Sequence, residues 1–152
     1  MTNSQYTVLI VGMGKRGLHH GTAFHANPRF KVVGICDIDK PRLEAAAPKV
    51  GNPKIGTDAA ALAKELKPDL FCFCTLPNLR LDFVKLGVES GARLIAFEKP
   101  VAMTSAEGLQ IKQALDKSRA KAVVKSWPAA RWDGSTPFTA PPPAGPLTCS
   151  AI

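Results

Sequence analysis

A glycine-rich hexapeptide, Gly12–Gly17 (GMGKRG), places the tightest limits on how this chain can fold. It follows directly after a short apolar run at residues 6–11 and leads into a segment of helical periodicity at 16–26. Asp37 stands twenty residues further on, at the end of a second apolar run at 30–36. A strand, a G-x-G-x-x-G turn, a helix and a second strand that ends in an acid make up the fingerprint of a dinucleotide-binding βαβ unit.

Each glycine of the fingerprint has a physical task. Gly12 permits a tight turn, Gly14 lets the backbone approach a pyrophosphate, and Gly17 lets helix and strand pack closely. The N-terminus of the helix then offers N–H groups and a partial positive charge to phosphate. The alternative is a glycine-rich turn that binds no ligand.

The acid after the second strand bears on the choice of cofactor. Asp37 can accept hydrogen bonds from an adenosine ribose diol, and its charge repels a 2′-phosphate. This favours NAD over NADP. Lys40 and Arg42 are close enough in sequence to soften the preference, so NADP stays possible. The alternative for both cations is a solvated helix start.

The rest of the pattern alternates between strand and helix. We predict strands over residues 6–11, 30–36, 70–76, 92–97 and 121–125, with a weaker one at 54–56. We predict helices over 16–26, 41–47, 58–66, 79–89 and 104–118, with Asp39, Thr57 and Thr104 as caps of three of them. This alternation predicts an α/β fold with a doubly wound parallel sheet, the Rossmann fold, in strand order 3-2-1-4-5-6.

The composition changes after residue 126. From 127 to 152, eight of the 26 residues are Pro or Gly, and the run 140–146 reads APPPAGP. Proline fixes φ and lacks an N–H donor, so this run cannot be a helix or a central strand. We therefore predict a dinucleotide-binding domain at 1–126 and an irregular, proline-rich and disordered tail at 127–152.

The net charge and the cysteines indicate which kinds of partner and which cellular compartment to expect. The net charge is +8, but basic and acidic residues are interleaved, so an anionic cofactor accounts for it as well as nucleic acid would. No apolar run reaches the ~20 residues of a membrane span, and no basic flank marks a signal peptide. The four cysteines and three histidines lack zinc-site spacing. We expect a cytoplasmic protein with free thiols, no metal, no membrane contact and no nucleic-acid partner.

Four segments together resemble the N-terminal domain of the Gfo/Idh/MocA oxidoreductases. They are GMGKRG at 12–17, CDIDKPR at 36–42, TLPN at 75–78 and FEKP at 97–100. The resemblance implies that the glycine loop binds the pyrophosphate, that Asp37 holds the ribose, and that the strand-four segment lies along the cofactor. It implies cofactor contacts from Gly12, Met13, Gly14, Lys15, Arg16, Gly17, Asp37, Thr75, Leu76, Pro77, Asn78, Glu98 and Lys99.

The resemblance also implies that Lys99 lies beside the nicotinamide and the substrate as the catalytic group. A lysine desolvated at the end of a buried strand can lose its proton near neutral pH, although a plain surface lysine is the alternative. His20 matches a histidine common in the family, and either a cofactor role or local packing would explain it.

Two departures from the family pattern matter. Leu81 stands where the family often has a histidine, and the family's second domain, which contacts substrate, has no counterpart in this sequence. We expect hydride transfer with a sugar or polyol only if another domain or chain completes the site. A non-catalytic dinucleotide-binding module, or a partner subunit, is the alternative. The oligomeric state stays open.

Overall fold

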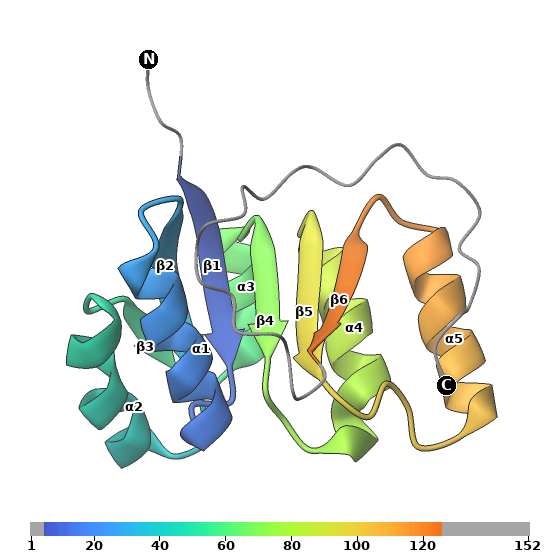
Figure 1. Ribbon diagram of the computed structural model, residues 1–152, viewed down its shortest axis with the longest axis horizontal. Helices are drawn as coiled ribbons and strands as arrows, with labels where there is room; N and C mark the ends of the chain where they lie inside the picture. The colour runs from blue at the N-terminus through green and yellow to red at the C-terminus, as the bar shows by residue number, and fades with distance from the viewer. Residues whose placement is uncertain (1–4, 126–152) are drawn as a thin grey trace.

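The computed structural model describes residues 5–125, which form one six-stranded sheet in the order β3-β2-β1-β4-β5-β6 (Figure 1). All neighbouring strands are parallel, so the predicted doubly wound α/β fold and strand order are confirmed. The strands are β1 (Tyr6–Val11), β2 (Phe30–Cys36), β3 (Lys54–Gly56), β4 (Leu70–Phe73), β5 (Leu94–Glu98) and β6 (Lys121–Lys125). The tail predicted at 127–152 lies outside the described residues, and the division into two segments stays a prediction.

Helices cover both faces of the sheet. They are α1 (Lys15–Ala26), α2 (Lys40–Ala46), α3 (Ala59–Leu66), α4 (Arg80–Glu89) and α5 (Ser105–Asp116). Two 3₁₀ turns add η1 (Ala47–Val50) after α2 and η2 (Pro77–Leu79) before α4. In Figure 1, α1 and α2 lie on one face beside β1, β2 and β3, whereas α3 and α4 lie on the other.

Each face of the sheet carries its own hydrophobic core, because successive side chains of a strand point to opposite faces. On β1, Val8 and Ile10 pack with Leu43 and Val50 from the α2–η1 segment. The alternate residue Leu9 packs toward the α3 and α4 side with Phe71. β4 is buried along its whole length and β1 is buried from Val8 to Val11, as expected for central strands of a parallel sheet.

The helix starts follow the capping rules, with one correction. The Asp39 side chain accepts from Arg42 N, and the Thr104 side chain accepts from Glu107 N, as predicted. The cap of α3 is Asp58, which accepts from Ala61 N, so the prediction of Thr57 was wrong. Aspartate and threonine are both good caps, so residue type alone does not decide between these two neighbours. α3 begins at Ala59, one residue later than predicted, and Asp58 is the residue directly before it.

Two strand predictions need corrected ends. β4 stops at Phe73, although the apolar sequence continues to Leu76, because the chain there departs from the sheet and enters η2. β5 begins at Leu94, two residues later than predicted, and ends at Glu98, one residue later than predicted. Both changes place polar and charged residues at the carboxyl ends of β4 and β5, the edge where parallel sheets bind ligands.

Candidate dinucleotide site

The glycine turn joins β1 to α1 at the carboxyl edge of the sheet, which lies along the lower side of Figure 1. Gly12 has a φ of +85°, in the left-handed region, and its N–H donates to Cys36 O at 2.8 Å. A Cβ at Gly12 would lie 2.7 Å from Cys74 O, and a Cβ at Gly17 would lie 1.8 Å from Gly12 O. Glycine is therefore required at both positions by the fold itself.

Gly14 differs from the other two glycines. Within residues 5–125, and apart from its immediate neighbours along the chain, no atom lies within 4 Å of where its Cβ would be, so this part of the structure leaves the space beside it open. Gly14 also caps α1 without any side-chain acceptor. The first turn of α1 thus lacks the side-chain acceptor that usually satisfies N–H groups at a helix start, an arrangement that suits an anion.

Asp37 is buried and holds the glycine turn in place. Its carboxylate accepts from Met13 N at 2.7 Å and from Asp39 N at 3.0 Å. Burial alone raises the pKa of Asp37, but the hydrogen bonds from Asp39 N, Met13 N and Arg42 outweigh it and lower the pKa below its usual value. Asp37 is therefore a carboxylate at neutral pH, with its charge directed at the turn.

Arg42 forms an ion pair with Asp37. Its Nη1 lies 3.1 Å from Asp37 Oδ1, and its Nη2 lies 3.1 Å from Asp39 Oδ2. The Arg42 side chain is 47% exposed, so it reaches this position from the solvent side. Of the two cations that the sequence offered as softening the repulsion of a 2′-phosphate, Arg42 is the one placed on Asp37.

The segment after β4 supplies the next part of the edge. Leu76 and Asn78 are exposed, and Pro77 begins η2. The Thr75 Oγ1 atom is buried and has no hydrogen-bond partner among the described residues. A buried hydroxyl without a partner is uncommon in folded proteins and is typical of sites that complete their hydrogen bonds with a ligand or water.

The predicted residues of β5 divide into a paired acid and an exposed lysine. Glu98 Oε1 lies 2.8 Å from His20 Nε2, and both side chains are more than four-fifths buried. His20 therefore joins α1 to β5. The Lys99 side chain is exposed, so the expectation that it is desolvated is wrong for the chain as it stands.

Arg80 is a functional candidate that sequence reasoning missed. Its side chain is 1% exposed, and its guanidinium lies over the rings of Phe73 and Phe97 at 5.6 and 5.8 Å. It donates to Pro100 O at 3.1 Å, to Thr75 O at 3.2 Å and to Lys99 O at 3.4 Å. Arg80 thus ties the loop after β4 to the loop after β5. The only sequence signal was its position between two leucines, Leu79 and Leu81.

Cys74 is the second residue that sequence reasoning missed. The neighbouring Cys72 and His20 lower the pKa of Cys74 to about 6, even though burial opposes the change. Cys36, buried beside Asp37, has its pKa raised to about 11 by burial. The spacing of the cysteines in the sequence could not predict that the two thiols differ in pKa, because Cys74 and His20 are far apart in the chain and only the fold brings them together.

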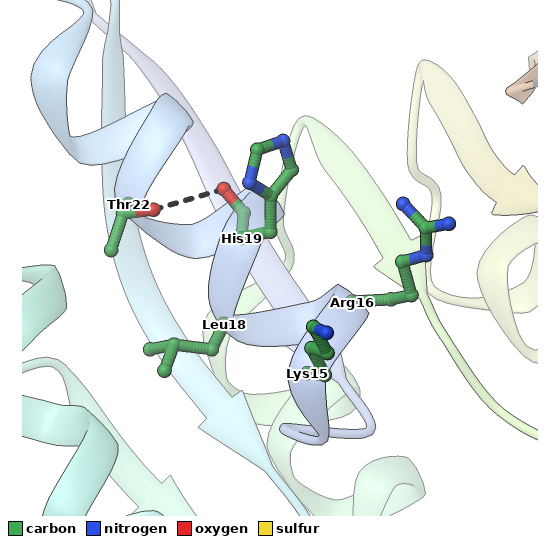
Figure 2. Close-up of a pocket in the computed structure, with 5 residues that line it drawn as sticks. All are labelled: Lys15, Arg16, Leu18, His19 and Thr22. Atoms are coloured by element: carbon green, nitrogen blue, oxygen red, sulfur yellow. Dashed lines mark hydrogen bonds between the residues drawn. The ribbon is translucent and has the colours of Figure 1, made fainter. Parts of the chain in front are cut away.

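A hollow of about 560 Å³ opens along α1, as Figure 2 shows. It is lined by Lys15, Arg16, Leu18, His19 and Thr22. It shares Lys15 and Arg16 with the predicted site but includes neither Asp37 nor the β4 and β5 residues. Among residues 5–125, no group of three potential ligands is arranged to hold a metal ion. Over the same residues, no helix is both long and apolar enough to cross a bilayer.

Comparison with known families decides what kind of domain this edge belongs to. Residues 6–126 match the family model GFO_IDH_MocA, described as an oxidoreductase family with an NAD-binding Rossmann fold. The chain belongs to this family. The resemblance inferred from GMGKRG, CDIDKPR, TLPN and FEKP is confirmed, and residues 6–126 are the NAD-binding domain of a Gfo/Idh/MocA oxidoreductase.

Individual relatives are dehydrogenases, and each is about three times as long as the part that this chain matches. D-glucoside 3-dehydrogenase of Escherichia coli (strain K12) is 29% identical over 105 residues, which is 68% of this chain and 30% of that protein. D-apiose dehydrogenase of Paraburkholderia graminis is 26% identical over 117 residues, 77% of this chain and 31% of that protein. The apo scyllo-inositol dehydrogenase of Lactobacillus casei shares the fold, with a TM-score of 0.75 and 17% identity over 82% of this chain and 37% of that one. The chain spans about a third of each.

Proposed function

We propose that this domain binds NAD(H) along the carboxyl edge of β1, β2, β4 and β5, and that it supplies the cofactor half of a hydride-transfer site. The observation that carries the proposal is Asp37, a buried carboxylate fixed by Met13 N at the glycine turn. A carboxylate there suits a ribose diol, and the uncapped start of α1 beside it suits a pyrophosphate.

The remaining predicted residues have separate tasks in the proposal. The N–H groups of Gly14, Lys15 and Arg16 face the pyrophosphate. Gly12 and Met13 shape the turn, since their own N–H groups donate to Cys36 O and to Asp37, and Gly17 keeps α1 against the turn. Thr75, Leu76, Pro77 and Asn78 line the nicotinamide half, and the unpaired Thr75 Oγ1 offers it a hydrogen bond. Glu98 stays paired with His20 and fixes the end of β5, so that Lys99 projects from a defined backbone position.

The proposed reaction is hydride transfer between the nicotinamide and a carbinol carbon of a sugar or polyol. NAD(H) supplies the hydride chemistry when bound, and Lys99 holds or releases the proton of the substrate oxygen. Relatives named for a glucoside, for apiose and for an inositol support this substrate class. Lys99 is exposed in this chain, so we propose that a further domain or chain must cover it and position the substrate.

The alternative is a module that binds the dinucleotide without turning over a substrate. The exposed Lys99 is the observation that favours it. We place either form in the cytoplasm, because the described cysteines are free, which suits a reducing compartment. We propose a dinucleotide rather than nucleic acid as the anionic partner, because Lys15, Arg16 and Arg42 surround the glycine turn.

Two glycine-to-alanine variants, one at the turn and one in α5, test cofactor binding. Gly14→Ala adds a methyl group into open space, so the fold should keep its melting temperature while the approach of a pyrophosphate is blocked. We expect NADH affinity, read by calorimetry, to fall by tenfold or more. Gly108→Ala in α5 is the control, since its Cβ would meet only Ala102 Cβ at 3.6 Å. Equal NADH affinity in the Gly14→Ala variant and the wild type would contradict the proposal.

A further inference from the structure

The acceptor positions of the Asp37 carboxylate are all occupied within the described part of the chain. A carboxylate has about four such positions, two on each oxygen. Oδ2 accepts from Met13 N at 2.7 Å and from Arg42 Nη1 at 3.2 Å. Oδ1 accepts from Asp39 N at 3.0 Å and from the same Arg42 Nη1 at 3.1 Å. The Asp37 side chain is 5% exposed, so its carboxylate is both buried and saturated.

A ribose diol needs two of these positions, so one of the present donors has to leave. Met13 N belongs to the glycine turn, and Asp39 N lies at the cap of α2, so both are fixed by the backbone. Arg42 is the third donor. Its side chain is 47% exposed and approaches Asp37 from the solvent side. Arg42 is therefore the donor that a ribose can displace without a change in the fold.

A second carboxylate keeps the guanidinium in place when it leaves Asp37. Arg42 Nη2 lies 3.1 Å from Asp39 Oδ2, and the Asp39 side chain is partly exposed. The other oxygen of Asp39 accepts from Arg42 N at 3.1 Å, which is the capping contact of α2. A rotation of the Arg42 side chain can thus free Asp37, while the helix keeps its cap and the guanidinium keeps a counter-ion.

We propose that Arg42 determines the cofactor preference of this domain by competing with the adenosine ribose for Asp37. The diol binds only after the guanidinium has left, so Arg42 lowers the affinity for NAD. The released guanidinium stays beside the ribose, where it pairs with the 2′-phosphate of NADP and offsets the charge of Asp37. One side chain thus acts against NAD and in favour of NADP. The inference rests on the proposed function, which gives the ribose to Asp37.

The electrostatics of Asp37 agree with such an exchange of partners. Burial raises the pKa of Asp37, but the hydrogen bonds from Asp39 N, Met13 N and Arg42 lower it below its usual value. The two backbone donors stay when Arg42 leaves. Asp37 then keeps one hydrogen bond on each oxygen and has one free acceptor position on each, which are the two that a diol requires.

Calorimetry of Arg42→Ala with NAD and with NADP tests the competition. Alanine removes the guanidinium but keeps the backbone N–H that donates to Asp39, so α2 keeps its cap. A half-exposed ion pair contributes little in water, so we expect the affinity for NAD to rise by about twofold to fivefold. The affinity for NADP should fall by about tenfold or more, because the 2′-phosphate loses its forked donor and meets the charge of Asp37.

Opposite signs for the two cofactors separate this role from a merely structural one, since a loss of structure weakens both. Lys40→Ala is the matched control, because Lys40 is an exposed cation at the first position of the same helix. It should move both affinities in one direction and by less than about twofold, because its charge is screened by solvent. In about 0.5 M NaCl, the gain of Arg42→Ala over wild type for NAD should shrink toward one, because the half-exposed pair is screened as well.

Arg42→Lys is the second variant and keeps the test open if the alanine variant does not fold. Lysine keeps the stem and the charge but lacks the fork that holds Asp37 and Asp39 together, so both effects should keep their sign and be smaller. An affinity for NAD that is equal to or below that of the wild type in the folded variants would overturn the competition. An unchanged affinity for NADP would overturn the role toward the 2′-phosphate. Wild-type protein that binds neither cofactor would refute the proposed function and this inference together.

Discussion

Replacing Arg80 by methionine tests whether one buried cation holds the two loops of the site together. Methionine keeps an apolar stem of similar length against Phe73 and Phe97 but removes every donor. Three carbonyl oxygens, on Thr75, Lys99 and Pro100, then lose their partner.

The magnitude follows from how far water can replace the guanidinium. A buried acceptor left without a donor costs ~1–3 kcal/mol. Lys99 and Pro100 are exposed, so their carbonyls fall at the low end, and Thr75 is only half-buried. Three such losses sum to about 3–4 kcal/mol, and release of the guanidinium from its desolvated position returns about 1 kcal/mol. We expect a net loss of about 2–3 kcal/mol, which lowers the melting temperature by about 8–12 °C in a domain of this size.

Urea unfolding and a thermal melt measure this loss, and calorimetry with NADH measures its effect on the site. Arg93→Met is the matched control, because Arg93 also lies over an aromatic ring, Tyr6 at 5.7 Å, but is exposed. It should cost about 0.5–1 kcal/mol. Arg80→Lys restores the charge without the forked donors and should fall between wild type and Arg80→Met. A loss below 1 kcal/mol in Arg80→Met, or one equal to that in Arg93→Met, would refute the reasoning.

Three further outcomes follow from the same edge of the sheet. Asp37→Asn should weaken NAD binding and bring NADP affinity up relative to it, and Arg42→Ala should do the opposite; calorimetry with both cofactors decides, and an unchanged ratio would contradict the role of Asp37. The pKa of Asp37 is lowered in the folded state, so its stabilising contribution is full above the unfolded pKa of ~3.9 and is lost as the pH falls toward the folded value; urea unfolding from pH 6 to pH 2 should show a flatter acid limb in Asp37→Asn. The chain alone should bind NAD but form negligible NADH in a screen of sugars and polyols; a turnover near ~10 s⁻¹ that vanished in Lys99→Ala would show that the site is already complete.

The fold followed from the sequence where local pattern and pairing agree. The strands at 6–11, 30–36, 54–56 and 121–125 have the predicted ends, because each is a β-rich run bounded by turn residues or a change of period. The strand at 70–76 was predicted too long, since Cys74 and Leu76 are apolar although they lie beyond Phe73, the last residue of β4. Apolar character reports burial but not which backbone groups pair, so it cannot locate the end of a strand beside a binding site.

The candidate site divides in the same way. The glycine turn and Asp37 were predictable, because a turn that needs Gly12 and Gly17 leaves its mark within one βαβ unit. Arg80 and Cys74 were not. The partners of Arg80 lie up to 20 residues away in the chain, and His20 meets Glu98 across 78. An arginine at the first position of a helix, such as Arg80 in α4, is usually solvent-exposed, and only the placement of the loops that accept its hydrogen bonds shows that this one is buried.

Two charged side chains, Asp37 and Arg80, are buried in the described part of the chain, and both lie at the carboxyl edge. Their partners have opposite polarity. Asp37 accepts from the N–H groups of Met13 and Asp39, whereas Arg80 donates to the carbonyls of Thr75, Lys99 and Pro100. An isolated charge in the interior is strongly unfavourable, and each of these is compensated by backbone dipoles of the loops that carry the site. The anion therefore fixes the turn proposed for the phosphates, and the cation fixes the loops proposed for the nicotinamide. A site whose backbone is held this way before a ligand arrives loses less conformational entropy on binding, which is why we expect the Arg80 variants to weaken NADH binding as well as the fold.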